Sequence, residues 1–294
     1  MKKKYKSPII LICDKKNFII NSKKFGFKKK INVTKINFLN KKINKNKINI
    51  INIDLKKGKK AKIQPLYDKD YIFKCFEMAF KILKKKITYK FINGPINKKK
   101  YLENKYSGIT EFITSKYKKK TGMLIYNKKL SVLPVTTHLP INALKRKITK
   151  KLIIEKLTIV DEFYRKRFKF KPKIAVTGLN PHCEGNGIFR EDDKIIFPAI
   201  NQAKNRKINV YGPFSADTIF LKQNRKKFDV IVGMYHDQVL TPIKTLFEYD
   251  AINITMGLPF LRISPDHGPN EKMINKNKSN PISLIRALEF LDKN

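Results

Sequence analysis

Cysteine, tryptophan and long apolar runs are scarce or missing in this chain of 294 residues. Its three cysteines, Cys13, Cys75 and Cys183, are isolated and form no Cys-x-x-Cys pair, which argues against a disulfide framework and a cysteine-based zinc site. A reducing cytoplasm is therefore the expected location. The first apolar run, Pro8–Cys13, is too short for a signal peptide, and no run is long enough to span a membrane. We expect no membrane partner.

Glycine-rich nucleotide-binding motifs are also missing. No G-x-G-x-x-G follows the first apolar run, and no G-x-x-x-x-G-K-[ST] occurs anywhere. The usual dinucleotide fingerprint and the P-loop are thus both excluded. With only 12 glycines and 14 prolines, the chain is not of low complexity either.

Acidic residues are few: 23 stand against 66 basic ones, for a formal charge of +43. Such a charge is typical of nucleic-acid binders. Only eight of the basic residues are arginine, however, and the lysines spread along the whole chain together with asparagine and isoleucine, which share A/T-rich codons. Genome composition explains the excess better than function does. We therefore expect no specific nucleic-acid partner.

Short apolar runs alternate with longer amphipathic ones along the chain. The predicted strands cover residues 8–13, 48–52, 89–94, 130–138, 173–178, 208–212 and 229–236. The predicted helices cover residues 71–86, 150–168 and 281–294. This alternation indicates an α/β fold with a mostly parallel sheet. The segment "YNKKLSVLPV" predicts a hairpin turn, and hence some antiparallel pairing.

Three of the four histidines, His138, His182 and His236, come at or just past the carboxyl end of a predicted strand. In α/β sheets, ligands bind outside these ends, so the three imidazoles can meet. Together they would form a site for zinc or a similar divalent ion. The alternative is that each histidine only caps its loop. Their shared position in a histidine-poor chain favours the metal site.

Other polar side chains crowd the same loops. Asp237 follows His236 directly, and Asp217 lies in "GPFSADT", which is equally typical of a simple helix cap. Lys244 and Arg262 could be ordinary surface cations. Arginine is scarce here, however, and "GLPFLR" is otherwise apolar, which is typical of an arginine that clamps an anion.

Six segments between Thr136 and Gly268 occur in the order found in a known family: "TTHLPI", "GLNPH", "GPFSADT", "MYHDQ", "NITMGLPFLR" and "SPDHG". They resemble the 4-hydroxythreonine-4-phosphate dehydrogenases of pyridoxal-phosphate biosynthesis. Upstream, "FINGPINK" and "GITEF" extend the resemblance, and so does "NPISL" near the end.

The resemblance implies a fold like that of isocitrate and isopropylmalate dehydrogenases, with two α/β domains and a cleft between them. The first domain is expected to combine residues 1–107 and 241–294. The second, residues 108–240, would carry the metal histidines and the dimer contacts. The family forms homodimers with the active site at the subunit interface, so the metal ligands would come from both subunits.

The implied reaction is NAD-dependent oxidation of 4-phosphohydroxy-L-threonine to a β-keto acid that decarboxylates to 3-amino-2-oxopropyl phosphate. NADP is the other candidate carrier, and one Zn, Mg or Co ion would be held by His138, His182 and His236. Thr110, Lys244, Asn253 and Arg262 match substrate-binding positions of the family. Asp217 and Asp237 match acidic residues near the metal, and with Lys244 they are the expected catalytic residues.

Departures from the family pattern keep other functions open. The usual first strand and its glycine-rich "GDPxGIGPE"-type turn are expected to be absent, because the chain starts at what looks like the next strand. Ile109 stands where the family has a substrate-contacting histidine, although Thr110 is retained. The loop after His182, and Pro269 with Asn270, also depart. The alternatives are a related dehydrogenase acting on another phosphorylated hydroxy acid and a catalytically impaired basic binding protein.

Overall fold

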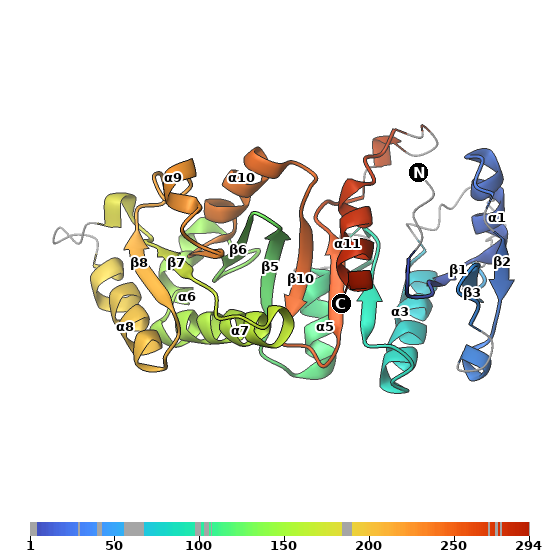
Figure 1. The fold of residues 1–294 in the computed structure, drawn as a ribbon, viewed down its shortest axis with the longest axis horizontal. Coiled ribbons are helices and arrows are strands. Elements are labelled where there is room, and N and C mark those ends of the chain that lie inside the picture. The colour runs from blue at the N-terminus through green and yellow to red at the C-terminus, as the bar shows by residue number, and fades with distance from the viewer. Residues whose placement is uncertain are drawn as a thin grey trace. The chain divides into compact units, whose positions relative to one another are not determined.

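The computed structural model describes residues 5–28, 30–39, 43–55, 68–97, 101–102, 106, 108–183, 190–269, 271–273, 276 and 278–293. The chain divides into two compact units (Figure 1). Unit 1 comprises Met1–Tyr106 and His267–Asn294, and unit 2 comprises Ser107–Asp266. Both units contain helices and strands, so the predicted α/β class is confirmed. Among the described residues, no helix combines the length and apolarity needed to cross a membrane.

Unit 1 contains a small parallel sheet in the order β1-β3-β2. The strands of this unit are β1 (Ile10–Cys13), β2 (Ile31–Val33), β3 (Ile48–Asn52) and β4 (Lys90–Ile92), of which β4 is not part of the three-stranded sheet. Its helices are α1 (Lys15–Lys24), α3 (Lys69–Lys84) and α11 (Ile282–Lys293), with short 3-10 turns η1 (Ile36–Phe38) and η6 (Glu271–Met273). Asp14 and Asp68 begin α1 and α3 by accepting backbone N–H bonds of 2.7 and 2.9 Å.

Unit 2 is built on one larger mixed sheet, in which its strands follow the order β11-β10-β5-β6-β9-β7-β8. The strands are β5 (Gly122–Asn127), β6 (Leu130–Pro134), β7 (Ile174–Thr177), β8 (Val210–Phe214), β9 (Val230–Gly233), β10 (Ile252–Met256) and β11 (Leu261–Pro265). The helices are α5 (Ile109–Tyr117), α6 (Leu144–Lys147), α7 (Lys150–Phe168), α8 (Phe197–Asn205), α9 (Lys222–Arg225) and α10 (His236–Phe247). Short turns η3 (Ile141–Ala143), η4 (Pro181–Cys183) and the π-helical η5 (Asp192–Ile196) complete it.

The sequence pattern explains the centre of this sheet. Strands β6, β9, β7 and β8 are parallel, and the predicted hairpin is confirmed because β5 and β6 pair antiparallel with Asn127 opposite Leu130. Successive strand residues face opposite sides. Val132 packs with α10, whereas its neighbour Ser131 accepts a 2.9 Å bond from Tyr164 of α7. Helices α7 and α10 therefore cover opposite faces.

The boundary between the units differs from the expected one. Residue 241 lies inside α10, and the segment that follows adds β10 and β11 antiparallel to β5. Residues 241–266 consequently belong to unit 2, not to the unit that contains both chain ends. This hydrogen-bonded pairing joins the strands carrying Asn253 and Arg262 to the unit that carries the three histidines. Lys244 belongs to the same unit because it lies in α10, the helix that begins at His236.

Candidate active site

The three histidines of the predicted metal site follow three neighbouring strands. His138 follows β6, His236 follows the central β9, and His182 follows β7. Backbone pairing between β6 and β9 continues past the strand ends, where Val135 and Thr136 donate to Gly233 and Met234. This continuation brings the His138 and His236 rings to a centroid distance of 5.7 Å.

Each ring of this pair has a carboxylate at its Nδ1 atom. The His138 Nδ1 lies 3.3 Å from the Glu111 carboxylate, and the His236 Nδ1 lies 2.6 Å from that of Asp237. A carboxylate at Nδ1 favours the tautomer in which the imidazole carries its proton on Nδ1. The lone pair of Nε2 is then available to a metal ion. Metal-binding histidines are held in this way. The pair therefore has the chemistry of two metal ligands.

His182 does not join this pair in the described part of the chain. It lies in η4 with a φ of 56°, a left-handed conformation, and its charge contributes to lowering the pKa of Asp217. No three His, Cys, Asp or Glu side chains among the described residues are arranged to hold an ion. The predicted triad is thus not assembled within one chain. Residues 184–189 of the following loop, where the sequence departs from the family, lie outside the described residues, as does Asn270.

Two side chains fix the loops that carry His182 and His236. Asp192, which is 1 % exposed, accepts bonds of 2.7 and 3.1 Å from the backbone N–H groups of Leu179 and Asn180. Gln238 accepts from Met234 N at 2.7 Å and donates to Gly178 O at 2.8 Å. It thereby ties the end of β9 to the end of β7. The position of His182 is therefore set by tertiary contacts.

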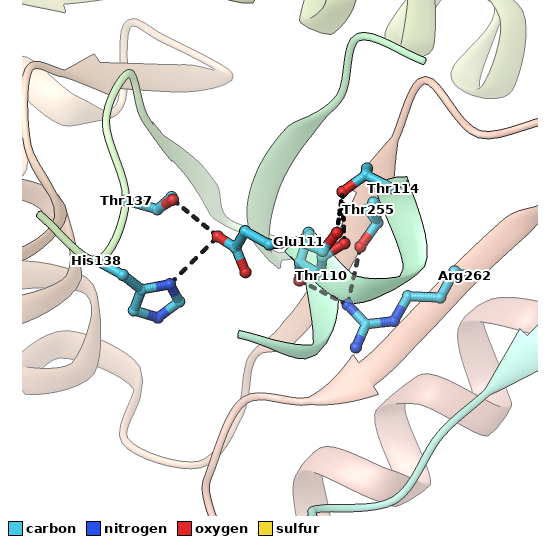
Figure 2. Close-up of polar contacts among 7 residues, drawn as sticks. All are labelled: Thr110, Glu111, Thr114, Thr137, His138, Thr255 and Arg262. Atoms are coloured by element: carbon cyan, nitrogen blue, oxygen red, sulfur yellow. Dashed lines mark hydrogen bonds and ion pairs between the residues drawn. The ribbon is translucent and has the colours of Figure 1, made fainter. Parts of the chain in front are cut away.

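A second polar cluster surrounds the start of α5 (Figure 2). Arg262 of β11 is 2 % exposed, and its Nη1 donates to the hydroxyls of Thr110 at 3.1 Å and Thr255 at 2.8 Å. Burial lowers the pKa of Arg262 to about 10, and the nearby Glu111 carboxylate opposes this shift. The guanidinium therefore remains charged at neutral pH.

Glu111 is the acidic member of the same cluster, as Figure 2 shows. Burial raises its pKa, but hydrogen bonds from His138, from the Glu111 backbone N–H and from Thr137, together with the electrostatic effect of His138, outweigh burial and bring the pKa to about 2. Its Oε1 atom lies 3.1 Å from the Thr137 hydroxyl. The carboxylate is thus ionised and lies between the histidine pair and the buried arginine.

The remaining predicted residues occupy different surroundings. Lys244 of α10 is 43 % exposed, and its Nζ is 2.7 Å from both the Asp266 carboxylate and the Asp266 carbonyl oxygen. Asn253 of β10 has a buried Oδ1 without a hydrogen-bond partner in the described part of the chain. The fully exposed Asp217 accepts a hydrogen bond from the Ser215 hydroxyl, which lowers its pKa.

Comparison with known proteins decides the family. The model of the family "Pyridoxal phosphate biosynthetic protein PdxA" matches residues 4–291. The chain belongs to this family. A relative from Sulfurihydrogenibium sp., named 4-hydroxythreonine-4-phosphate dehydrogenase, is 40 % identical over 73 % of this chain and 67 % of its own length. A D-threonate 4-phosphate dehydrogenase from Salmonella typhimurium is 35 % identical over 68 % of this chain and 62 % of its own.

A solved structure agrees with the fold of this PdxA-family chain. That structure, of a putative 4-hydroxythreonine-4-phosphate dehydrogenase from Salmonella typhimurium, has a TM-score of 0.81 and 28 % identity, and the match covers 97 % of this chain and 91 % of that one. The matched sequence segments are shorter. Among the first curated relatives they span 67, 57 and 49 % of those proteins.

The sequence pattern does not predict three residues that contact the candidate site of this PdxA-family chain, namely Glu111, Asp192 and Gln238. Glu111 lies within "GITEF", and neither Asp192 nor Gln238 stands in a pattern that indicates a role. Of the three, only Glu111 has a sequence feature that could indicate a role. It follows Thr110 at the start of a helix, where a side chain projects toward a neighbouring loop. The contacts of Asp192 and Gln238 cross between strands, so no local pattern indicates them.

Proposed function

We propose that this chain oxidises 4-phosphohydroxy-L-threonine with NAD, or alternatively NADP. The product is a β-keto acid that loses CO2 to give 3-amino-2-oxopropyl phosphate, a step of pyridoxal 5'-phosphate biosynthesis. The family match over residues 4–291 carries this proposal. The cytoplasm is the proposed location, and the three free thiols support a reducing compartment.

A divalent ion, Zn, Mg or Co, is proposed to be held by His138 and His236 of one subunit and by His182 of the partner subunit. The donor set fits such an ion, because both rings of the pair have Nδ1 occupied by a carboxylate. When bound, the ion would polarise the substrate oxygen, and NAD would accept the hydride.

The side chains of this chain would bind, orient and move protons. Lys244, Arg262 and Thr110 are proposed to bind the anionic ends of the substrate, since cations and hydroxyls bind phosphate and carboxylate groups. The unpartnered Oδ1 of Asn253 can accept an O–H or N–H of the substrate. Asp237 orients His236. Asp217 and Lys244 are proposed to exchange protons with the substrate and its product.

An assay of NAD reduction tests the reaction. The purified chain is given 4-phosphohydroxy-L-threonine with and without added Zn²⁺, Mg²⁺ or Co²⁺, and D-threonate 4-phosphate is the competing substrate, because a relative bears that name. Faster, metal-stimulated reduction with the first substrate is expected. Preference for D-threonate 4-phosphate would instead establish the alternative, a related dehydrogenase of another phosphorylated hydroxy acid. No reduction with either substrate would contradict both.

Dimerisation is the second expectation. Among the described residues His182 does not join the His138–His236 pair, and we propose that a second subunit supplies it. Sedimentation analysis at micromolar concentration should give a mass near 69 kDa, twice the 34.4 kDa of the chain. The His182→Ala variant should remain a dimer but bind less metal. A monomer with full activity would contradict the shared site.

Ile109→His is expected to tighten substrate binding and to weaken the unliganded fold. Ile109 is 6 % exposed at the first turn of α5, so an imidazole there would be buried. Its hydrogen-bond partner would be the bound substrate. KM should fall by up to roughly 10- to 100-fold, the worth of one hydrogen bond to a charged group. The free protein should lose about 1–3 kcal/mol of unfolding free energy.

The matched control for this change is Ile113→His, one turn further along α5, where the side chain is fully buried. It should lower the melting temperature without improving KM. Steady-state kinetics at saturating NAD and thermal melts of both variants measure the difference. An unchanged KM in Ile109→His would show that this pocket is shaped for another substrate.

A further inference from the structure

We propose that Glu111 is a positioning residue that fixes the His138 ring for metal binding and at the same time compensates the buried charge of Arg262. This inference rests on the proposed function, because it assigns His138 to a metal and Arg262 to the substrate. It would make one carboxylate responsible for the geometry of both sites. Figure 2 shows Glu111 between the two groups.

The contact with His138 is a hydrogen bond between an ionised acceptor and a ring nitrogen. Oε1 of Glu111 receives the Thr137 hydroxyl at 3.1 Å and lies 3.3 Å from the His138 Nδ1. Two neighbouring donors thus hold one oxygen, and the ring is held with Nε2 pointing away from the carboxylate. His138 has a φ of 32°, so the backbone is strained and gains from an external restraint.

The residue before α5 allows this close approach. A Cβ atom built on Gly108 would lie 2.5 Å from Oε2 of Glu111 and 3.1 Å from Cε1 of His138. Both side chains therefore rest against backbone that must lack a side chain. A side chain at this position would displace the carboxylate or the imidazole.

The contact with Arg262 is electrostatic rather than a direct hydrogen bond. The Nη1 of Arg262 is occupied by two neutral hydroxyls, and Glu111 is the charge that favours the protonated guanidinium. Oε2 of Glu111 is buried and has no hydrogen-bond partner among the described residues. Oε1 takes both hydrogen bonds, so Oε2 is the carboxylate oxygen that has none in the described part of the chain. The carboxylate belongs to the residue that follows Thr110, whose hydroxyl binds Arg262. Asp237, in comparison, is 80 % exposed, so water screens its charge beside His236.

Glu111→Gln tests the role of the charge while keeping the size of the side chain. Zn²⁺ affinity of the substrate-free protein, measured by competition with a chromophoric chelator, should fall roughly 10- to 100-fold, as for other partners of metal-binding histidines. KM for the phosphorylated substrate should rise, because Arg262 would lose the negative charge that favours its protonated form. The matched control is Glu155→Gln in α7, which removes a carboxylate paired with Lys120 at 3.1 Å. It should change neither quantity.

Two further variants separate positioning from folding. Thr137→Val removes one donor to Oε1 and should weaken Zn²⁺ binding by a smaller factor, with an unchanged melting temperature. In a His138→Ala background, Glu111→Gln should cause no further loss of Zn²⁺ affinity, because its effect passes through that ring. Wild-type Zn²⁺ affinity in both Glu111→Gln and Thr137→Val would overturn this inference alone. Absence of Zn²⁺ binding by the wild-type chain would overturn the proposed metal site and this inference with it.

Discussion

His236→Ala should lower activity by two to three orders of magnitude and abolish tight metal binding. His236 begins α10 directly after the central strand β9, and its ring lies beside that of His138. A bound divalent ion contributes several kcal/mol to such reactions, and about 1.4 kcal/mol corresponds to a tenfold change in rate. Asp237 would also lose the ring that it orients at 2.6 Å. Metal content after gel filtration and kcat/KM measured with added Zn²⁺ test the loss.

His267→Ala is the matched control, because His267 is the one histidine outside the proposed metal site. Its Nδ1 lies 3.0 Å from the Gly268 carbonyl oxygen, so it has a local contact of its own. Metal content should match that of the wild type. If His236→Ala kept full metal content and activity, the pair at the ends of β6 and β9 would not be a metal site, and the ion would have to bind elsewhere.

The arrangement of the histidines shows how far the sequence determines the site. Apolar runs predicted β6, β7 and β9, and their carboxyl ends placed His138, His182 and His236 along one edge of the sheet, as observed. The pattern could not separate His182 from the other two. That separation depends on a left-handed turn and on the contact of Asp192 with Leu179, both of which come from tertiary packing.

The unit boundary shows a different limit. Short apolar segments such as β10 and β11 carry no local signal for the strand they pair with, and the resemblance placed them with the chain ends. The antiparallel pairing of Asn253 with Ile125 instead extends the sheet of unit 2. Glu111 was missed for a related reason: its partners His138 and Arg262 are distant in sequence, so only the fold brings the three together.

Lys244→Met should reduce kcat by roughly 10²- to 10⁴-fold, the usual contribution of one proton-transferring group. Lys244 lies on the same helix as His236, about 12 Å further along its axis at 1.5 Å per residue. Its Nζ contacts Asp266, whose side chain is 11 % exposed, so the ammonium is held at a defined position while 43 % of the lysine side chain remains open to solvent. Methionine fills a similar volume but offers neither charge nor proton. It also leaves the Asp266 carboxylate without this cation.

Lys244→Arg distinguishes proton transfer from substrate binding. The guanidinium keeps the positive charge but does not release its proton near neutral pH, so KM should stay near the wild-type value while kcat remains low. Lys222→Met, which removes an exposed lysine of α9 in the same unit, is the control for the lost charge and should leave both constants unchanged. Steady-state kinetics at saturating NAD compare the three variants. If Lys244→Arg restored kcat, Lys244 would serve only as a cation for the substrate, and the proton would have to be carried by another group, with Asp217 the next candidate.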